Sequence, residues 1–186
     1  MLIGFTALVV GLLSRPDTTI LLGQVERDLT GDGKAETLRV VGVGRTIDSL
    51  DVTFTIAAGD SVIFRSRLAP LTRIAGFDAG RRVASLSEHQ ARLAEFAGWF
   101  FDTRKFISPK AIVDDLQRSG PGRIAEIPSV ADRDRRPQEG RRGTAIWEEI
   151  SRSPVTIFTF SPGGDALTAI GWSRHSRRFY RLLECC

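Results

Sequence analysis

The residues between Asp28 and Glu36 have the types and spacing that could bind a hard divalent cation. Their sequence is DLTGDGKAE, so oxygen-bearing side chains recur at alternate positions. Calcium takes about six to eight oxygen ligands, and glycine supplies the positive φ that turns a chain tightly around an ion. We therefore predict a cation loop in which the ligands are Asp28, Thr30, Asp32, the carbonyl of Lys34 and Glu36.

This run resembles the D-x-[DNT]-G-D-G calcium loops of dockerins and of FG-GAP-type repeats in extracellular adhesion proteins. The resemblance implies a structural Ca²⁺ ion and covers only residues 28–36. It departs from the helix-loop-helix version at the twelfth loop position, where Arg39 replaces a bidentate glutamate. A bound cation would then need water molecules or another carboxylate, and the candidates are Asp17, Asp48 and Asp51.

A metal-free turn is the alternative interpretation of the same residues. Asp, Thr and Gly also form hairpin turns through hydrogen bonds from the backbone to the side chains. The segments 20–26 and 37–43 on either side have strand-like patterns. The loop is therefore expected to close a β-hairpin, with or without an ion.

The sequence contains few residues that could form another catalytic site. His89 and His175 are the only histidines, and none of the motifs GxSxG, GxxxxGK[ST] or HExxH occurs. The pairs Asp114-Asp115 and Glu148-Glu149 are adjacent in predicted helices, so their side chains diverge by about 100° and do not converge on one bond.

These observations favour a binding or structural protein over an enzyme. Two alternative functions remain open: a metal-assisted hydrolase that uses the 28–36 loop, and an accessory subunit that docks on a membrane-associated complex. In the second alternative, the docking surfaces would be the Arg-rich segment 119–143 and the aromatic residues Trp99, Phe100 and Phe101.

The composition is that of one ordinary folded domain. Hydrophobic residues make up 42% of the 186 residues and charged residues 26%, with a net charge of +4. Basic residues total 26, and all but Lys34, Lys105 and Lys110 are arginines. They are interleaved with acidic residues rather than gathered in a stripe, which disfavours nucleic acid as a partner. A protein partner is compatible with this surface, and the oligomeric state is left open.

The apolar segment Leu2–Leu13 is too short to cross a membrane as a helix, because it would span about 18 Å of a hydrocarbon core of about 30 Å. It matches the apolar region of a secretory signal, and a buried strand or helix is the alternative. We therefore expect residues 1–16 to be a signal peptide or an apolar segment that associates with a membrane. The folded domain, residues 17–186, would then be periplasmic or secreted.

The cysteines, Cys185 and Cys186, are adjacent at the end of the chain. Two neighbouring thiols cannot form a four-ligand zinc site alone, and the chain has no third cysteine to pair with. Their role is left open.

The expected elements are strands, then helices, then strands. Alternating apolar residues predict a hairpin of 50–56 and 61–68, with Val62, Phe64 and Leu68 on one face. A capping box at Ser85 predicts the next helix, and Pro109 and Thr144 mark two more helix starts. Three strands (155–160, 167–172 and 179–185) form a C-terminal meander. The predicted fold is α+β: antiparallel hairpins and this meander packed on two or three helices, with a mobile charged loop at about 119–143.

Overall fold

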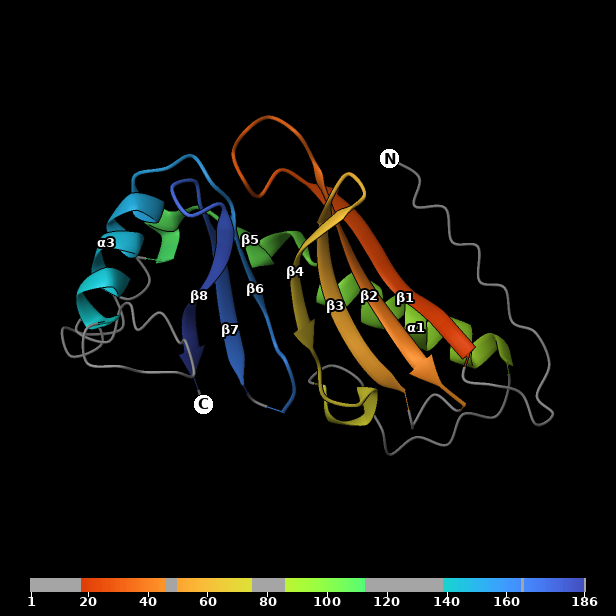
Figure 1. Cartoon of the computed structure of the whole chain (residues 1–186). Coiled ribbons are helices and arrows are strands. Elements are labelled where there is room, and N and C mark those ends of the chain that lie inside the picture. The colour runs from red at the N-terminus through yellow and green to blue at the C-terminus, as the bar shows by residue number, and fades with distance from the viewer. Residues whose placement is uncertain (1–17, 46–49, 75–85, 113–138, 165, 186) are drawn as a thin grey trace.

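The computed structural model describes residues 18–45, 50–74, 86–112, 139–164 and 166–185, which form two antiparallel four-stranded sheets and a few helices (Figure 1). This architecture confirms the predicted α+β class. The first sheet has the order β1 (Thr18–Arg27), β2 (Glu36–Gly44), β3 (Asp51–Ala58) and β4 (Ser61–Arg67). The second sheet has the order β5 (Phe106–Ile107), β6 (Ile157–Phe160), β7 (Leu167–Ser173) and β8 (Arg178–Cys185). The helices are α1 (Leu86–Phe100) and α3 (Glu139–Ser151), with 3-10 turns η2 (Leu71–Arg73) and η3 (Thr103–Lys105).

Alternation along the strands of the first sheet separates an inner apolar face from an outer polar face. In β3, Val52, Phe54 and Ile56 are fully buried, while Thr53 and Thr55 between them point the other way. This confirms the predicted hairpin of β3 and β4, and the predicted hairpin of β1 and β2 is also present.

The predicted position of Val62 is wrong. Phe64 pairs with Ile56 and faces the core, but the register shifts between Ile56 and Ala57, so Val62 pairs with Ala57. Such a bulge moves the residues beyond it to the opposite face. Val62 is consequently 52% exposed on the outer face.

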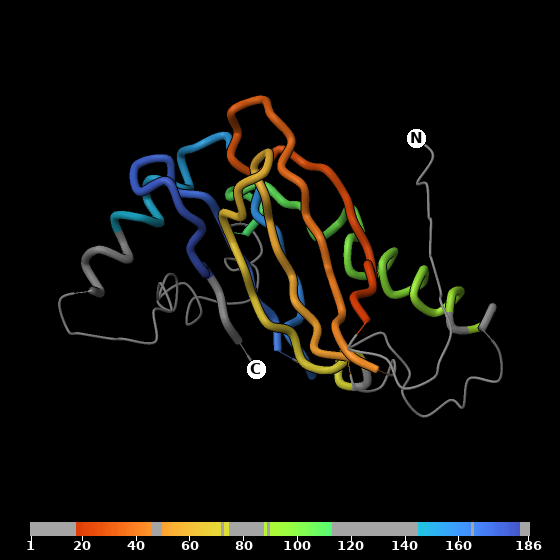
Figure 2. Tube along the Cα trace, turned by 45° about the vertical axis from the view of Figure 1, so that its right-hand side comes forward, coloured from red at the N-terminus to blue at the C-terminus, as the bar shows by residue number. Residues whose placement is uncertain are grey.

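Two different layers cover the inner face of the first sheet. Helix α1 lies on the β1 side, where Gly23 allows a close approach to Ala97 and Phe101. The second sheet covers the β3 and β4 side (Figures 1 and 2). Its β6 contributes Phe158 and Phe160 to the shared core.

The second sheet is buried on both faces. While Phe158 and Phe160 face the first sheet, Ile157 lies in a second apolar cluster. Helix α3 closes that cluster with Ile150, and Gly171 of β7 leaves room for the helix to approach. The molecule is therefore layered, with the first sheet at one side and α3 at the other, and within the described ranges no helix or strand covers the outer face of the first sheet.

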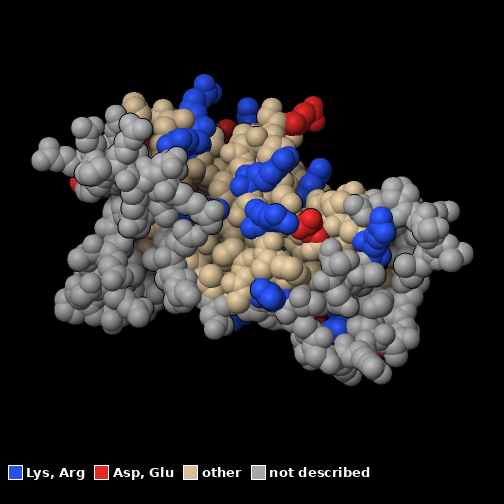
Figure 3. All heavy atoms as spheres, turned by 60° about the horizontal axis from the view of Figure 1, so that its bottom comes forward, with Lys and Arg blue, Asp and Glu red and all other residues tan. Residues whose placement is uncertain are grey.

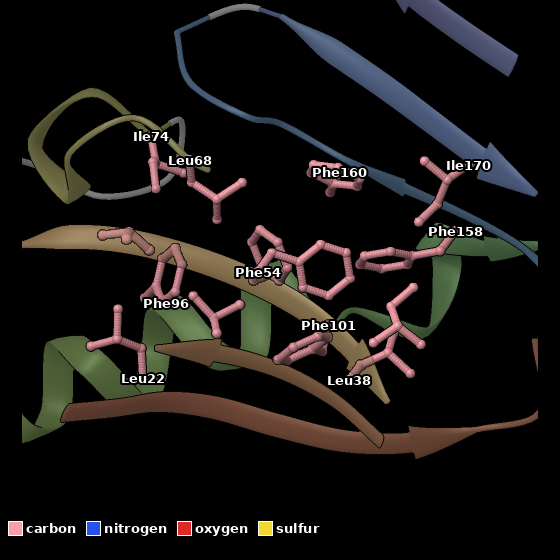
Figure 4. Packing of buried hydrophobic residues seen from close by; sticks show 14 of the residues in the cluster. Leu22, Leu38, Phe54, Leu68, Ile74, Phe96, Phe101, Phe158, Phe160 and Ile170 are labelled. Atoms are coloured by element: carbon pink, nitrogen blue, oxygen red, sulfur yellow. The ribbon is translucent and has the colours of Figure 1, made fainter. Parts of the chain in front are cut away.

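Phe54 is the point at which the layers meet. Between centroids, its ring lies 5.4 Å from that of Phe158 and 5.1 Å from that of Phe160 (Figure 4). It also lies 5.5 Å from the ring of Phe100 in α1. Phe100 and Phe101 are buried and Trp99 is partly buried, as expected for three consecutive aromatic residues on a packed helix. The aromatic cluster is therefore core, which removes Phe100 and Phe101 as docking residues for a membrane complex.

Three predictions about the middle of the chain need correction or lie outside the described residues. Helix α3 already begins at Glu139. The predicted helix start at Thr144 is therefore wrong, and so is the C-terminal end of the predicted loop 119–143. Residues 113–138 are outside the described part, as is the capping residue Ser85. Pro109 does begin a helical segment. The two-residue strand β5 was not expected, and it turns the predicted three-strand meander into a four-stranded sheet.

The close approach of α1 to β1 gives a stability prediction. A Cβ at position 23 would lie 2.8 Å from the Cβ of Ala97, closer than van der Waals contact. We expect Gly23→Val to lower the free energy of unfolding by about 1–3 kcal/mol, as overpacking usually does. Gly98→Ala is the matched control, since a Cβ there meets open space and alanine favours a helix by up to about 1 kcal/mol. Urea unfolding would contradict the predicted packing if both variants were as stable as the native chain.

Candidate functional site

The predicted cation loop connects β1 to β2 and brings three carboxylates together. Oxygen atoms of Asp28, Asp32 and Glu36 lie within 4.8 Å of one another. Gly31 and Gly33 have φ angles of 69° and 85°, a conformation that glycine adopts without steric cost. The sequence therefore predicted the turn and the convergence of its acidic side chains.

Hydrogen bonds from the loop's own backbone hold the two aspartates. Asp28 accepts from the N–H of Gly31 at 2.7 Å and from that of Gly33 at 2.8 Å. Asp32 accepts from the N–H of Lys34 at 2.9 Å, and this bond is the main cause of a lowered pKa for Asp32. These are the side-chain to backbone contacts of a self-capped turn.

Glu36 is the buried member of the group, with only 3% of its surface exposed. Its carboxylate accepts from the N–H of Leu29 at 2.7 Å and from the hydroxyl of Thr30 at 3.0 Å. Leu29 is fully buried in the core. A buried carboxylate needs hydrogen-bond donors to offset its desolvation. Glu36 thus holds the start of the loop in place through these two hydrogen bonds.

The loop also contacts the second sheet. The Arg174 side chain, from the β7–β8 turn, donates hydrogen bonds to the carbonyls of Thr30 and Gly31. The N–H of Thr156 donates to the carbonyl of Leu29 at 3.3 Å. Gly31 is seated against Pro154, whose carbonyl oxygen would lie 2.5 Å from a Cβ at position 31.

Three carboxylates outside the loop were candidates to complete the coordination of a cation, and one of them lies far from it. Asp51 pairs with Val43, at the far end of β2 from Glu36, and forms an ion pair with Arg67. The expectation that Asp51 could complete the coordination is therefore wrong. Asp17 and Asp48 lie outside the described residues.

The charge around the loop is mixed. The side chains of Lys34 and Arg174 both lower the pKa of Asp32 through their positive charge, which adds to the effect of the hydrogen bonds. These two positive side chains compensate part of the negative charge of the carboxylates, which a bound cation would otherwise neutralise. The donor set fits Ca²⁺ in chemical type, since it is made of hard oxygens, and water would have to supply the remaining ligands.

A second polar cluster, which sequence reasoning missed, links α3 to the β7–β8 turn. Glu149 accepts from the hydroxyl of Ser173 at 2.6 Å and from the N–H of His175 at 3.0 Å. Burial opposes ionisation of Glu149, but these hydrogen bonds outweigh it, so the pKa of Glu149 lies below its ordinary value. Ser173 is fully buried, so its hydroxyl fastens the helix rather than facing a substrate. Glu149 therefore joins α3 to the β7–β8 turn.

Lys105 is the other titratable group that the sequence did not single out. Its Nζ is buried and has no hydrogen-bond partner among the described residues. It lies 3.5 Å from the centroid of the Trp99 ring, which attracts a cation. Desolvation nevertheless dominates and lowers the pKa of Lys105 to about 8, while Asp102 opposes that shift and Arg104 adds to it.

The lowered pKa of Lys105 predicts a pH dependence of stability. In the unfolded chain this amine keeps its ordinary pKa of 10.5, so between about pH 8 and pH 10.5 the unfolded state binds more protons than the folded state. The free energy of unfolding should therefore rise through that interval as the pH increases. We expect Lys105→Met to remove this rise, measured by chemical denaturation of both proteins at several pH values. Parallel pH profiles for the two proteins would contradict the assignment.

Comparison of the chain with protein-family models, with curated proteins and with solved structures finds no significant match. Among the described helices, none has the length and apolar character needed to cross a bilayer.

Proposed function

We propose that this chain is an extracytoplasmic binding or structural protein in which the 28–36 loop joins the two sheets. One observation carries the role of the loop: it is fastened to the second sheet by the Arg174 side chain and seated at Gly31 against Pro154. A loop whose base is bonded to a neighbouring layer contributes stiffness. Such stiffness suits a scaffold that presents a surface to a partner.

The metal-assisted hydrolase is less well supported by this placement. A catalytic cation needs an open coordination position that faces a concave pocket. Two shallow hollows on the described surface are lined by other residues, around Phe106–Lys110 with Ser151–Thr156, and around Ala69 with Pro162–Gly164. The Arg174 guanidinium, which is itself a cation, occupies two of the loop carbonyls.

The extracytoplasmic compartment is proposed from the sequence alone. The segment Leu2–Leu13 has the length and apolar character of the central region of a secretory signal. An accessory role on a membrane-associated complex is compatible with the same segment.

The convergence of Asp28, Asp32 and Glu36 favours a second candidate role for the loop, in which it holds a structural Ca²⁺ ion. In that case Asp28, Thr30, Asp32, the Lys34 carbonyl and Glu36 would be the ligands. The ion would reinforce the same joint, because its ligands span both ends of the turn.

A pair of glycine substitutions tests the joint. Gly31 and Gly33 both have positive φ, so alanine at either position costs about 1–2 kcal/mol in backbone strain. Only Gly31 lies against Pro154, in the connection from α3 to β6, while a Cβ at Gly33 meets open space. We expect Gly31→Ala to lower the free energy of unfolding by more than Gly33→Ala does. Equal losses in thermal or urea unfolding would show that the contact with Pro154 does not hold the sheets together.

Affinity purification from the native membrane and soluble fractions tests the binding role, with the native chain and the two glycine variants as baits. We expect a retained partner that is lost in parallel with stability in Gly31→Ala. Recovery of the chain alone from both fractions would contradict a binding function.

The calcium role predicts a change in stability with metal. Millimolar calcium chloride should raise the melting temperature of the native chain, and a chelator should reverse that change, because an ion that binds only the folded state stabilises it. Asp28→Asn should abolish the effect, whereas Asp60→Asn, in the exposed β3–β4 turn, should keep it. The calcium role fails if titration calorimetry detects no heat and the melting temperature does not change.

A further inference from the structure

We propose that the outer face of the first sheet binds an acidic protein surface through Arg39, Arg65 and Arg67. This inference rests on the proposed binding function and names the site and the chemistry of the partner. These three side chains are here called the arginine face. They come from β2 and β4 and are separated by up to 28 positions in the sequence.

Strand register brings the three arginines together. Arg39 pairs with Thr55, and Thr55 pairs with Arg65, so one row across the sheet contains both arginines. Neighbouring strands are about 4.8 Å apart, which separates these two Cα atoms by about 10 Å. Arg67 follows Arg65 on the same face of β4, about 7 Å further along the strand. The three guanidinium groups can therefore reach carboxylates on a single partner surface.

The arginine face is solvent-exposed and only partly neutralised. Arg67 keeps 77% of its side chain exposed while it pairs with Asp51, and Arg39 donates to the side chain of Gln24 at 2.7 Å. Arg65 makes no hydrogen bond or ion pair with any residue in the described ranges. Exposed pairs of this kind contribute only about 0–1 kcal/mol, so carboxylates of a partner can replace them at little cost.

Exposed aliphatic side chains share the outer face with the arginines. Leu21 is 54% exposed, Val43 41% and Val62 52%, and all three lie on the same outer face. Figure 3 shows basic side chains over the middle of the face that it draws, among mostly uncharged residues. Arginine is enriched at protein–protein interfaces, and the buried centres of such interfaces are more apolar than the rest of a protein surface.

The same face is poorly suited to nucleic acid. The outward positions of the four strands include Glu26 and Asp51, which would repel phosphate groups, and they include no aromatic residue on which a base could stack. A protein surface that combines carboxylates with apolar side chains satisfies both the arginines and the aliphatic residues. Charge complementarity and the apolar surroundings therefore favour an acidic protein over a polyanion.

A helical peptide provides a direct test. The probe carries glutamates and leucines on one face, and its control carries glutamine in place of each glutamate. By fluorescence anisotropy we expect the native chain to bind the acidic peptide, less tightly as salt increases, and to bind the glutamine peptide at least about tenfold more weakly. The triple variant Arg39→Gln, Arg65→Gln and Arg67→Gln should lose at least about tenfold in affinity for the acidic peptide.

A matched triple variant removes the same charge elsewhere. Arg73→Gln, Lys110→Gln and Arg152→Gln change exposed residues outside the arginine face, and this variant should bind the acidic peptide as the native chain does. Melting curves establish that both triple variants are folded.

Three results would overturn the inference: no binding of the acidic peptide, equal weakening by both triple variants, or tighter binding of single-stranded DNA or heparin than of the peptide. The affinity purification distinguishes this failure from failure of the proposed function. If the arginine-face variant retains the native partner as the native chain does, the binding function stands and the assigned site is wrong. If no partner is retained by the native chain, the binding function itself fails.

Discussion

The inner face of the first sheet is apolar and has to be buried, and two layers share that task. Helix α1 covers the β1 side and the second sheet covers the β3 and β4 side, and both meet at Phe54. Rings from β3, α1 and β6 contact one another there with centroid separations of 5.1–5.5 Å. Because interiors are closely packed, this shared cluster fixes the position of three layers at once.

The polar contacts at the periphery follow from that arrangement. Once the two sheets are packed, the β1–β2 loop lies beside the β7–β8 turn, so that Arg174 can reach the carbonyls of Thr30 and Gly31. The same turn presents Ser173 and the N–H of His175 to Glu149 of α3. One short turn is thus bonded to the loop on one side and to the helix on the other. The acidic loop is best understood together with these contacts, as part of the way the layers are joined.

Most of the local structure could be predicted from the sequence. Period-2 alternation is a strong signal where one face is buried and the other is wet, and β3 follows it throughout. The acidic loop was also predictable, because alternating donors and two glycines specify a tight turn through local hydrogen bonds. Two predictions about the local structure were wrong, each for a separate reason. A bulge moved Val62 to the outer face, and α3 extends into a charged segment that has little apolar periodicity.

What the sequence determined by itself is the set of hairpins, the position of the acidic turn and the α+β class, since all of these depend on residues that are neighbours in the chain. Tertiary structure alone decided that Arg174 reaches the loop, that the Nζ of Lys105 is buried against Trp99 and that Asp51 lies far from Glu36. It also placed Arg39, Arg65 and Arg67 on the same face of the first sheet. The physical reason is that these relations depend on strand register and on how layers cover one another. Both are set by the packing of the whole core, and no local pattern of residues encodes them.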